Sequence, residues 1–439
     1  MFFKFKFNFI SLVFLCLSFF LFSYTFFKSE IVYKGMQNEY YLKFYFFSLV
    51  IFLLSLISFF LGSKIRNNLA LLIFSSYFVL VLIEILISKN IFNEINIFKY
   101  ESKNSKKFDR RDRYEIFSDL TILDPNIKIT LPPSQLLEYN KNLFPLGGIS
   151  NSKTINCNEN GEYSIFSSDR YGFNNPDFVW DNKKKLITII GDSYGMGSCV
   201  NRPLDIASQI RKKLNSKGEV VNLSYGGNNL LIEYASLIEY YDEINSKHLI
   251  WLVYEDDANN PQEIVTNSIL SNYIENDSFS QSLPIKQKEI DAHLNQIIPE
   301  KFSNFKDKNK YSKIFETIKL YNLRKLIKNY DLKYKLFDDY SEIIFKKTKE
   351  FSEKRGFKII VVYIPSIKTI KTKNYQNNNN KSLISLLKKL NIDVIDVGKE
   401  FNKISDVNSY IPLSLPGHFN EAGYKRISDI IFENIKNKI

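Results

Sequence analysis

Apolar residues are distributed very differently in the first ninety residues and in the remainder of the chain. Three stretches of about twenty residues, at 7–27, 44–62 and 69–88, consist mainly of Phe, Leu, Ile, Val and Ser. A helix of about twenty apolar residues is long enough to cross a bilayer. Glu84 is the only charged residue within these stretches. The pattern predicts that residues 1–89 form an anchor of three transmembrane helices.

A signal peptide is the alternative for the first stretch, because Lys4 and Lys6 precede it. Its apolar part is longer than a signal core and no small-residue cleavage site follows, which favours a membrane span. Basic residues favour the cytoplasmic side of a membrane. Lys64 and Arg66 lie between the second and third stretches, although the first loop carries three lysines. An N-terminus in the cytoplasm and three spans place residues 90–439 outside it.

The segment after the anchor is rich in charge and then in proline. Charged residues crowd positions 99–114, and four prolines follow at Pro125, Pro132, Pro133 and Pro145. Proline removes a backbone donor and interrupts regular structure. We therefore expect residues 90–160 to be a connector.

Residues 161–439 alternate between short β-rich runs and helical patterns, which is typical of a parallel sheet with crossover helices. The predicted strands are 186–190, 219–224, 248–253, 357–363 and 392–397. The predicted helices are 204–216, 230–245, 341–355, 380–390 and 421–437. A polar, Lys-rich helical insertion is expected at about 258–340. The expected fold class is α/β, a flavodoxin-like parallel sheet of five strands with helices on both faces.

The net charge of +12 and the pI near 9.1 suggest a nucleic-acid partner at first sight. No zinc-ligand spacing, aromatic RNA-binding strand or helix-turn-helix accompanies this charge, so we expect no nucleic-acid partner. Residues 301–350 hold fourteen Lys or Arg against seven Asp or Glu. This excess is interpreted as a solvated helical face, or as a basic surface lying on anionic lipid or polysaccharide.

Candidate chemistry is concentrated at the ends of predicted strands, where ligands bind to open parallel sheets. The first strand stops at Gly191-Asp192-Ser193, and His418 stands before the last helix. Free backbone N–H groups at a helix start favour an oxyanion near Ser193, and His418 can accept the serine proton. Gly227, after the second strand, lets a backbone N–H approach closely. The alternative is that Asp192, Ser193 and His418 only cap helices.

This arrangement resembles the GDSL/SGNH hydrolase superfamily over roughly residues 165–435. The run Asp169-Arg170-Tyr171-Gly172-Phe173-Asn174-Asn175 resembles the segment before the first strand in membrane-anchored bacterial members. The resemblance implies that Ser193 is the nucleophile, supported by Asp192, and that His418 is the general base. It also implies an oxyanion hole made by the N–H groups of Ser193 and Gly227 with an Asn side chain.

The sequence departs from the family in the loop after the third strand. The position of the family's Asn falls on Asp257, where an ionised carboxylate would repel the developing oxyanion. Losing one such donor costs about 3–4 kcal/mol of barrier. Asp257 would have to be protonated, or Asn228 or Asn259 would have to replace it.

A second departure concerns the acid of the family's triad. This acid is expected two or three residues before the histidine, where the chain has Leu415 and Pro416. A backbone carbonyl or a distant carboxylate must then orient His418. Asp256 and Asp257 lack a third ligand at a suitable spacing, so we expect no metal and no cofactor.

The cysteines bear on the compartment. Cys16 lies in the first apolar stretch, which leaves Cys157 and Cys199 in the rest of the chain. An oxidising compartment would let these two pair. We predict a disulfide that ties the segment before the first strand to the turn after Ser193, with two unrelated buried thiols as the alternative.

The expected function is that of a membrane-anchored serine esterase or O-acyltransferase acting on acyl (acetyl) esters of an envelope or exported polysaccharide. The alternative is a catalytically impaired protein of this fold that binds glycan or serves in envelope polysaccharide assembly. The expected partners are an acylated glycan, membrane lipid and, for transfer, a membrane protein that supplies the acyl donor. The expected location is a bacterial inner membrane with the soluble domain extracytoplasmic.

Overall fold

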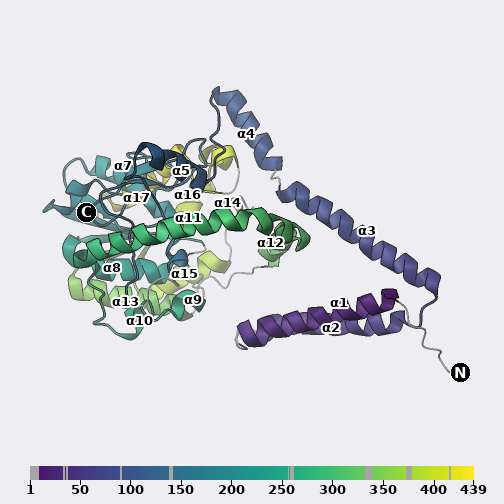
Figure 1. Ribbon diagram of the computed structural model, residues 1–439. Helices are drawn as coiled ribbons and strands as arrows, with labels where there is room; N and C mark the ends of the chain where they lie inside the picture. The colour runs from purple at the N-terminus through teal and green to yellow at the C-terminus, as the bar shows by residue number, and fades with distance from the viewer. Residues whose placement is uncertain are drawn as a thin grey trace. The chain divides into compact units, whose positions relative to one another are not determined.

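The computed structural model describes residues 9–32, 35, 38–88, 91–137, 142–255, 257, 262–331, 339–371, 378–414 and 417–439. The chain forms two compact units. The first contains Met1–Lys89 and Ser312–Asn329, and the second contains Asn90–Tyr311 and Tyr330–Ile439. Figure 1 labels the helices of both units.

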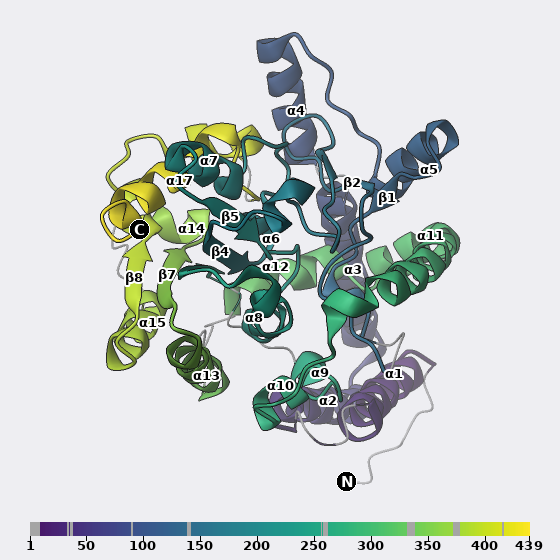
Figure 2. The ribbon, with the colours of Figure 1, turned by 90° about the vertical axis from the view of Figure 1, so that its left-hand side faces the viewer.

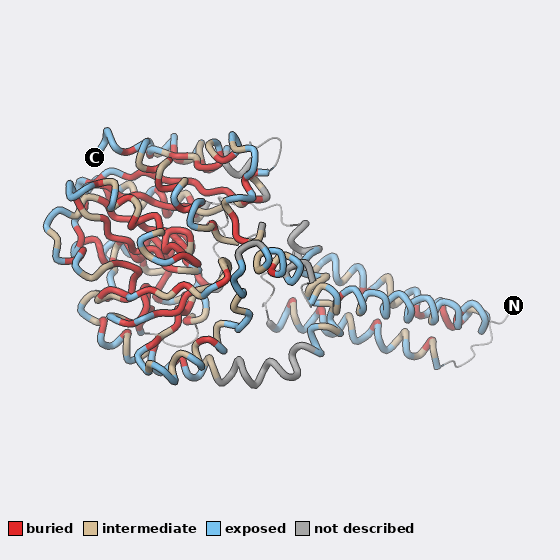
Figure 3. The backbone as a smooth tube through the Cα atoms, turned by 90° about the horizontal axis from the view of Figure 1, so that it is seen from above, coloured by how far each residue is buried: buried red, intermediate tan, exposed pale blue. Residues whose placement is uncertain are grey.

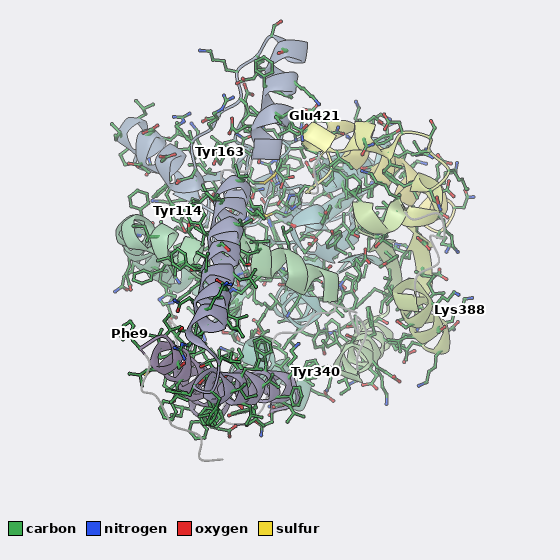
Figure 4. All side chains as sticks on the ribbon, turned by 90° about the vertical axis from the view of Figure 1, so that its right-hand side faces the viewer. Phe9, Tyr114, Tyr163, Tyr340, Lys388 and Glu421 are labelled. Atoms are coloured by element: carbon green, nitrogen blue, oxygen red, sulfur yellow. A yellow bond between two sulfur atoms is a disulfide. The ribbon has the colours of Figure 1, made fainter. Side chains whose placement is uncertain are left out.

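Three helices of the first unit are long and apolar enough to cross a membrane. They are α1 (Phe9–Phe26), α2 (Asn38–Ser58) and α3 (Ser63–Ser88). Figure 4 labels Phe9, the first residue of α1. A π-helical turn, η1 (Phe27–Val32), continues α1. Large apolar side chains cover much of their exposed surface, and Figure 3 shows these helices mainly in the exposed and intermediate colours. Such a surface fits lipid as its solvent.

The contact between α1 and α2 uses small polar residues. Ser11, Ser18 and Thr25 are buried on α1 at intervals of seven, and Ser48 and Ser55 are buried on α2 at the same interval. Most of these hydroxyls donate to a carbonyl of their own helix, as Thr25 does to Leu21 at 2.9 Å. Small side chains at this spacing let two membrane helices approach closely.

The second unit is built on a parallel sheet of five strands in the order β5-β4-β6-β7-β8. Its strands are β4 (Lys185–Gly191), β5 (Glu219–Asn222), β6 (His248–Tyr254), β7 (Lys358–Ile364) and β8 (Asp393–Asp396). All neighbouring pairs are parallel. The first strand therefore lies between the second and the third, as in doubly wound sheets. The predicted fold class is confirmed.

Helices cover both faces of this sheet (Figure 2). One face packs on α7 (Ile206–Leu214), α16 (Val397–Phe401) and α17 (Glu421–Ile435). The other packs on α8 (Leu230–Ile244), α13 (Asp339–Arg355) and α15 (Asn378–Lys389). Alternate residues of β4 serve the two cores, since Ile187 and Ile189 belong to the first and Ile190 to the second. This double burial explains the continuous apolar run in the sequence.

The insertion between β6 and α13 is helical in its described part. Its elements are α9 (Gln262–Val265), α10 (Asn272–Glu275), η4 (Leu283–Lys286), α11 (Gln287–Ile318) and α12 (Tyr321–Asp331). The remaining short helices of the unit are η2 (Pro133–Gln135), η3 (Asp177–Trp180), α6 (Ser193–Met196), α14 (Ile367–Ile370), η5 (Val407–Tyr410) and η6 (Pro412–Ser414).

The segment expected as a connector, 90–160, has regular structure and belongs to the second unit. It contains α4 (Ile91–Asn104), α5 (Arg113–Leu123), β1 (Lys128–Ile129) and β2 (Lys153–Ile155). A side-chain capping box of Asp112 and Glu115 begins α5. β2 pairs with β3 (Ile165–Ser167), across the expected boundary at 160. The four prolines lie outside these helices and strands, so they do not interrupt this regular structure.

Candidate active site

Ser193 stands where the central strand β4 gives way to the four-residue helix α6. Asp192 caps this helix, because its Oδ1 accepts from the Tyr194 N–H at 2.8 Å. Gly197 ends it in the left-handed region, with φ of 79°. The N–H of a first helical residue has no acceptor within its helix. The cap thus fixes both the Ser193 hydroxyl and an N–H that remains available beside it.

Two buried amides hold the carbonyls of α6. Asn174 Nδ2 donates to Met196 O at 2.9 Å, and Asn222 Nδ2 donates to Gly195 O at 2.8 Å. Asn174 comes from the segment before β4 and Asn222 ends β5. The turn that carries Ser193 is therefore fixed from two directions.

Asp169 organises the segment that supplies Asn174. Its fully buried carboxylate accepts four hydrogen bonds, from the N–H groups of Tyr171 and Phe173, Asn175 Nδ2 and Trp180 Nε1. Burial raises the pKa of Asp169 to about 6, against the lowering effect of these donors. Asn175 also bonds both backbone groups of Asn222. This network explains why the run 169–175 contains an aspartate and two asparagines.

His418 lies within hydrogen-bond distance of the serine. Its Nε2 is 2.8 Å from Ser193 Oγ, whereas Asp192 Oδ2 is 3.2 Å from the same hydroxyl. Tyr194 supports the histidine segment, since its hydroxyl donates to Gly417 O at 3.0 Å and its ring centroid is 5.0 Å from that of His418. The structure therefore brings together two side chains that are 225 residues apart in the chain.

A carboxylate that was not predicted from the sequence holds the other side of His418. Glu159 Oε1 is 2.9 Å from His418 Nδ1, and Oε2 accepts from the His418 backbone N–H at 2.6 Å. Glu159 lies between β2 and β3, within the segment expected as a connector. It is thus a distant carboxylate, one of the two alternatives left by the residues before His418. Its nearness to Cys157 was the signal that could have found it.

Each partner of this pair favours the charged form of the other. Burial alone would raise the pKa of Glu159, but the hydrogen bonds and charge of His418 hold it below its usual range. Burial alone would lower the pKa of His418, but the hydrogen bond and charge of Glu159, with the charge of Asp192, raise it above its ordinary value. An Nδ1–H that donates to Glu159 leaves the Nε2 lone pair directed at the serine hydroxyl.

A disulfide fastens the Glu159 loop to the region of Ser193. Cys157 and Cys199 are bonded, with their Cα atoms 4.9 Å apart. Asn160 Nδ2 also donates to the Cys199 carbonyl at 2.8 Å. Cys199 Sγ lies 3.7 Å from His418 Nδ1. These three side chains are close enough to hold a metal ion, but sulfurs bonded to each other are not thiolate ligands.

The turn that carries Gly227, one of the two predicted backbone donors of the oxyanion hole, lies beside the other, Ser193. Tyr225 and Asn228 close a turn, because the Asn228 N–H donates to Tyr225 O at 3.2 Å, and Gly227 has φ of 84° at its third position. A Cβ atom added to Gly226 would lie 3.9 Å from Ser193 Cβ, so the turn contacts the serine. Within the described part of the chain, neither the Ser193 N–H nor the Gly227 N–H has a hydrogen-bond partner.

The Asp257 side chain caps the end of strand β6. Its buried Oδ2 accepts from the Tyr254 N–H at 2.6 Å, and its carbonyl accepts from the Leu230 N–H at 3.2 Å. Asn228 Nδ2 donates to Gly191 O at 3.3 Å. Four further positions that bear on the two departures from the family pattern, Asp256, Asn259, Leu415 and Pro416, lie outside the described residues.

No protein-family model matches the chain, and no curated protein matches it. Among solved structures it is similar to TesA, with 11% identity, a TM-score of 0.34 and coverage of 58% of this chain and 100% of that one. It is also similar to a lipase/acylhydrolase from Enterococcus faecalis (12% identity, TM-score 0.32, coverage 58% and 96%). A third is a catalytic mutant of the acetylxylan esterase Axe2 from Geobacillus stearothermophilus (11% identity, TM-score 0.34, coverage of 58% of this chain and 94% of that one).

Proposed function

We propose that this protein is a membrane-anchored serine esterase of the GDSL/SGNH type. One observation carries the proposal: an unbroken chain of hydrogen bonds runs from Ser193 Oγ through both ring nitrogens of His418 to Glu159. A nucleophile, a base and a third group that orients the base are the parts that acyl transfer through serine requires. A residue that only caps a helix would need neither the contact between Ser193 and His418 nor the contact between His418 and Glu159.

In the proposed reaction Ser193 Oγ attacks the ester carbonyl while His418 Nε2 takes its proton. Glu159 holds the ring in the required tautomer and stabilises the imidazolium. The N–H groups of Ser193 and Gly227 donate to the oxyanion. His418 then protonates the leaving alkoxide, which leaves an acyl-Ser193 intermediate. Water, deprotonated by His418, releases the acid and restores the serine.

We propose that the substrate is an acyl (acetyl) ester of an envelope or exported polysaccharide. The disulfide fits an oxidising compartment, and the charges around the spans favour an extracytoplasmic soluble domain at a bacterial inner membrane. The resemblance of residues 169–175 to membrane-anchored family members supports a glycan ester. Transfer to a sugar hydroxyl would use the same acyl-enzyme and a membrane partner that supplies the acyl donor.

The alternative of a catalytically impaired, glycan-binding protein rested on two departures from the family pattern. Glu159 supplies the missing contact to His418, which removes one of them. The other, Asp257, leaves the two backbone donors in place. The contacts around Ser193 therefore favour the enzyme.

A fluorophosphonate probe tests the proposal, because such probes label only activated serines. The full-length protein in detergent is expected to be labelled, and Ser193→Ala to be unlabelled. Acetate release from an O-acetylated polysaccharide then tests the substrate class. Absence of both labelling and release in folded protein would contradict the enzyme and favour the glycan-binding alternative.

A further inference from the structure

Glu84 is the one acidic residue in the third apolar helix, and it is completely buried. Its partners come from the insertion of the α/β domain, more than two hundred residues later. Glu84 Oε1 accepts from the Asn322 N–H at 2.8 Å and from Asn322 Nδ2 at 2.9 Å, and Oε2 accepts from the Leu323 N–H at 2.8 Å. A carboxylate in a membrane span is costly unless it is paired in this way.

A second contact lies deeper along the same face of α3. Tyr77 donates its hydroxyl to the carbonyl of Ile318 at 2.8 Å. Tyr77 precedes Glu84 by seven residues, which is two helical turns or about 10 Å. It precedes the end of the span, Ser88, by eleven residues, or about 16 Å, roughly half of a hydrocarbon core about 30 Å thick. The corner between α11 and α12 thus follows α3 well into its apolar length.

Several backbone groups of this corner have hydrogen-bond partners within the corner or on α3, as a lipid environment requires. The N–H groups of Lys319, Leu320 and Arg324 donate to the carbonyls of Phe315, Thr317 and Leu320. The Ile318 carbonyl accepts from Tyr77, and the first N–H groups of α12 donate to Glu84. Tyr77 and Glu84 of α3 thus supply hydrogen-bond partners to backbone groups of the corner.

The side chains on the outside of the corner are apolar to an extent that is unusual for an exposed, Lys-rich insertion. The exposed fractions are 60% for Ile314, 59% for Phe315, 52% for Ile318, 47% for Tyr321 and 56% for Leu326. Basic residues alternate with them: Lys319, Arg324 and Lys325 are also exposed. Apolar side chains with interspersed Lys and Arg are the composition of a segment at the edge of a bilayer.

We infer that residues 314–326 are a fourth, re-entrant membrane element, which lies against α3 with its apolar side chains in lipid and its long basic side chains extended toward the headgroups. Residues 312–329 belong to the same compact unit as the spans, which agrees with this assignment. The partner of this surface is the bilayer itself. The inference is independent of the proposed esterase activity.

Spin labels test it in the full-length protein in liposomes. Cys16 is the free cysteine among the described residues, so Cys16→Ser leaves the disulfide and frees single cysteines for labelling. A label at Phe315→Cys is expected to show high collision with oxygen and low collision with a water-soluble nickel complex. Phe74→Cys in α3 (71% exposed) is the lipid control, and Phe178→Cys in the α/β unit (59% exposed) is the water control.

The result at position 315 decides the matter. A profile like that at 74 supports the inference, and a profile like that at 178 overturns it. In Glu84→Ala the label at 315 is expected to move toward the water profile, with a smaller change in Glu84→Gln, which keeps a carbonyl acceptor. An unchanged profile in Glu84→Ala would overturn the anchoring role of Glu84. Thermal unfolding of each variant reports separately that it is folded.

Discussion

The turn that carries Ser193 and the loop that carries Glu159 reach the same histidine by different means. The turn consists of consecutive residues, Asp192–Met196, at the end of a central strand that is buried on both faces. The loop, Cys157–Gly161, joins two strands of three residues and depends on a disulfide and on Asn160 for its position. One half of the site is fixed by the sheet, and the other by contacts added to it.

The largest effect is expected from the Ser193 turn and from the histidine that the two halves share. Ser193→Ala removes the proposed nucleophile and His418→Ala the proposed base. Loss of one member of a group of residues that act as a unit lowers kcat by up to about 10⁶-fold. Hydrolysis of p-nitrophenyl acetate by each variant measures this, with thermal unfolding as the control for folding. Turnover that survives either change would remove that residue from the mechanism.

Glu159→Gln tests the added half. The carboxamide can still accept from the backbone N–H of His418, but it no longer stabilises the imidazolium, so kcat is expected to fall by about 10²- to 10⁴-fold. Glu162→Gln is the matched control, because Glu162 lies three residues away and pairs with Lys106 at the surface. Equal activities of the two variants would show that His418 does not need Glu159.

The pH profile sharpens the same comparison. His418 must be neutral to accept a proton, so kcat/KM falls as the pH drops through the pKa of His418. Glu159 raises that pKa, and its replacement by Gln should lower it. The acid limb of the residual activity of Glu159→Gln is therefore expected at lower pH than that of the parent. A limb at the same pH or higher would contradict the pairing.

Loss of the disulfide should have a smaller effect on rate than loss of the carboxylate. Cys157→Ser with Cys199→Ser leaves the bond from Asn160 to the Cys199 carbonyl position, so Glu159 keeps part of its support. Misplacement of a catalytic group by about 1 Å lowers the rate by about 10²-fold. We take this value as the upper limit for the fall in kcat. Stability is expected to fall by about 3–4 kcal/mol, since the bridge spans 42 residues. Urea unfolding and ester hydrolysis measure the two effects, and an unchanged stability would argue that the thiols are unpaired.

Asp257→Asn is expected to change the least. An Asn oxygen can also accept from the Tyr254 N–H, so the cap survives the change. A rise in kcat approaching the 10²-fold or so that one oxyanion donor contributes would instead place residue 257 at the oxyanion. Steady-state kinetics on the folded variant distinguish these outcomes.

Much of the fold is predictable because its signals are local. The five strands of the sheet are short apolar runs, and the ends of the helices carry recognisable caps, such as Asp205 before α7 and Asn420 before α17. The turn at Ser193 and the placement of His418 follow from the same signals. The three apolar helices are equally clear from length and composition.

The Glu159 side of the site was not predictable in this way. Strands of two or three residues show no hydrophobic period, so β1, β2 and β3 could not be told from a connector between prolines. Nothing next to Glu159 in the sequence marks it as a partner of His418, because that contact spans 259 residues. Only the predicted pairing of Cys157 with Cys199 pointed to this loop, and it pointed to a position two residues away.

The bond between Cys157 and Cys199 encloses more than the Glu159 loop. Glu159 and Ser193 both lie between the two cysteines in the chain, so they belong to one covalent ring, and His418 alone is outside it. Local opening of the segment that carries His418 would stop the reaction while leaving the other two residues together. We therefore expect inactivation by such local opening to be reversible, because it depends on the docking of a single segment.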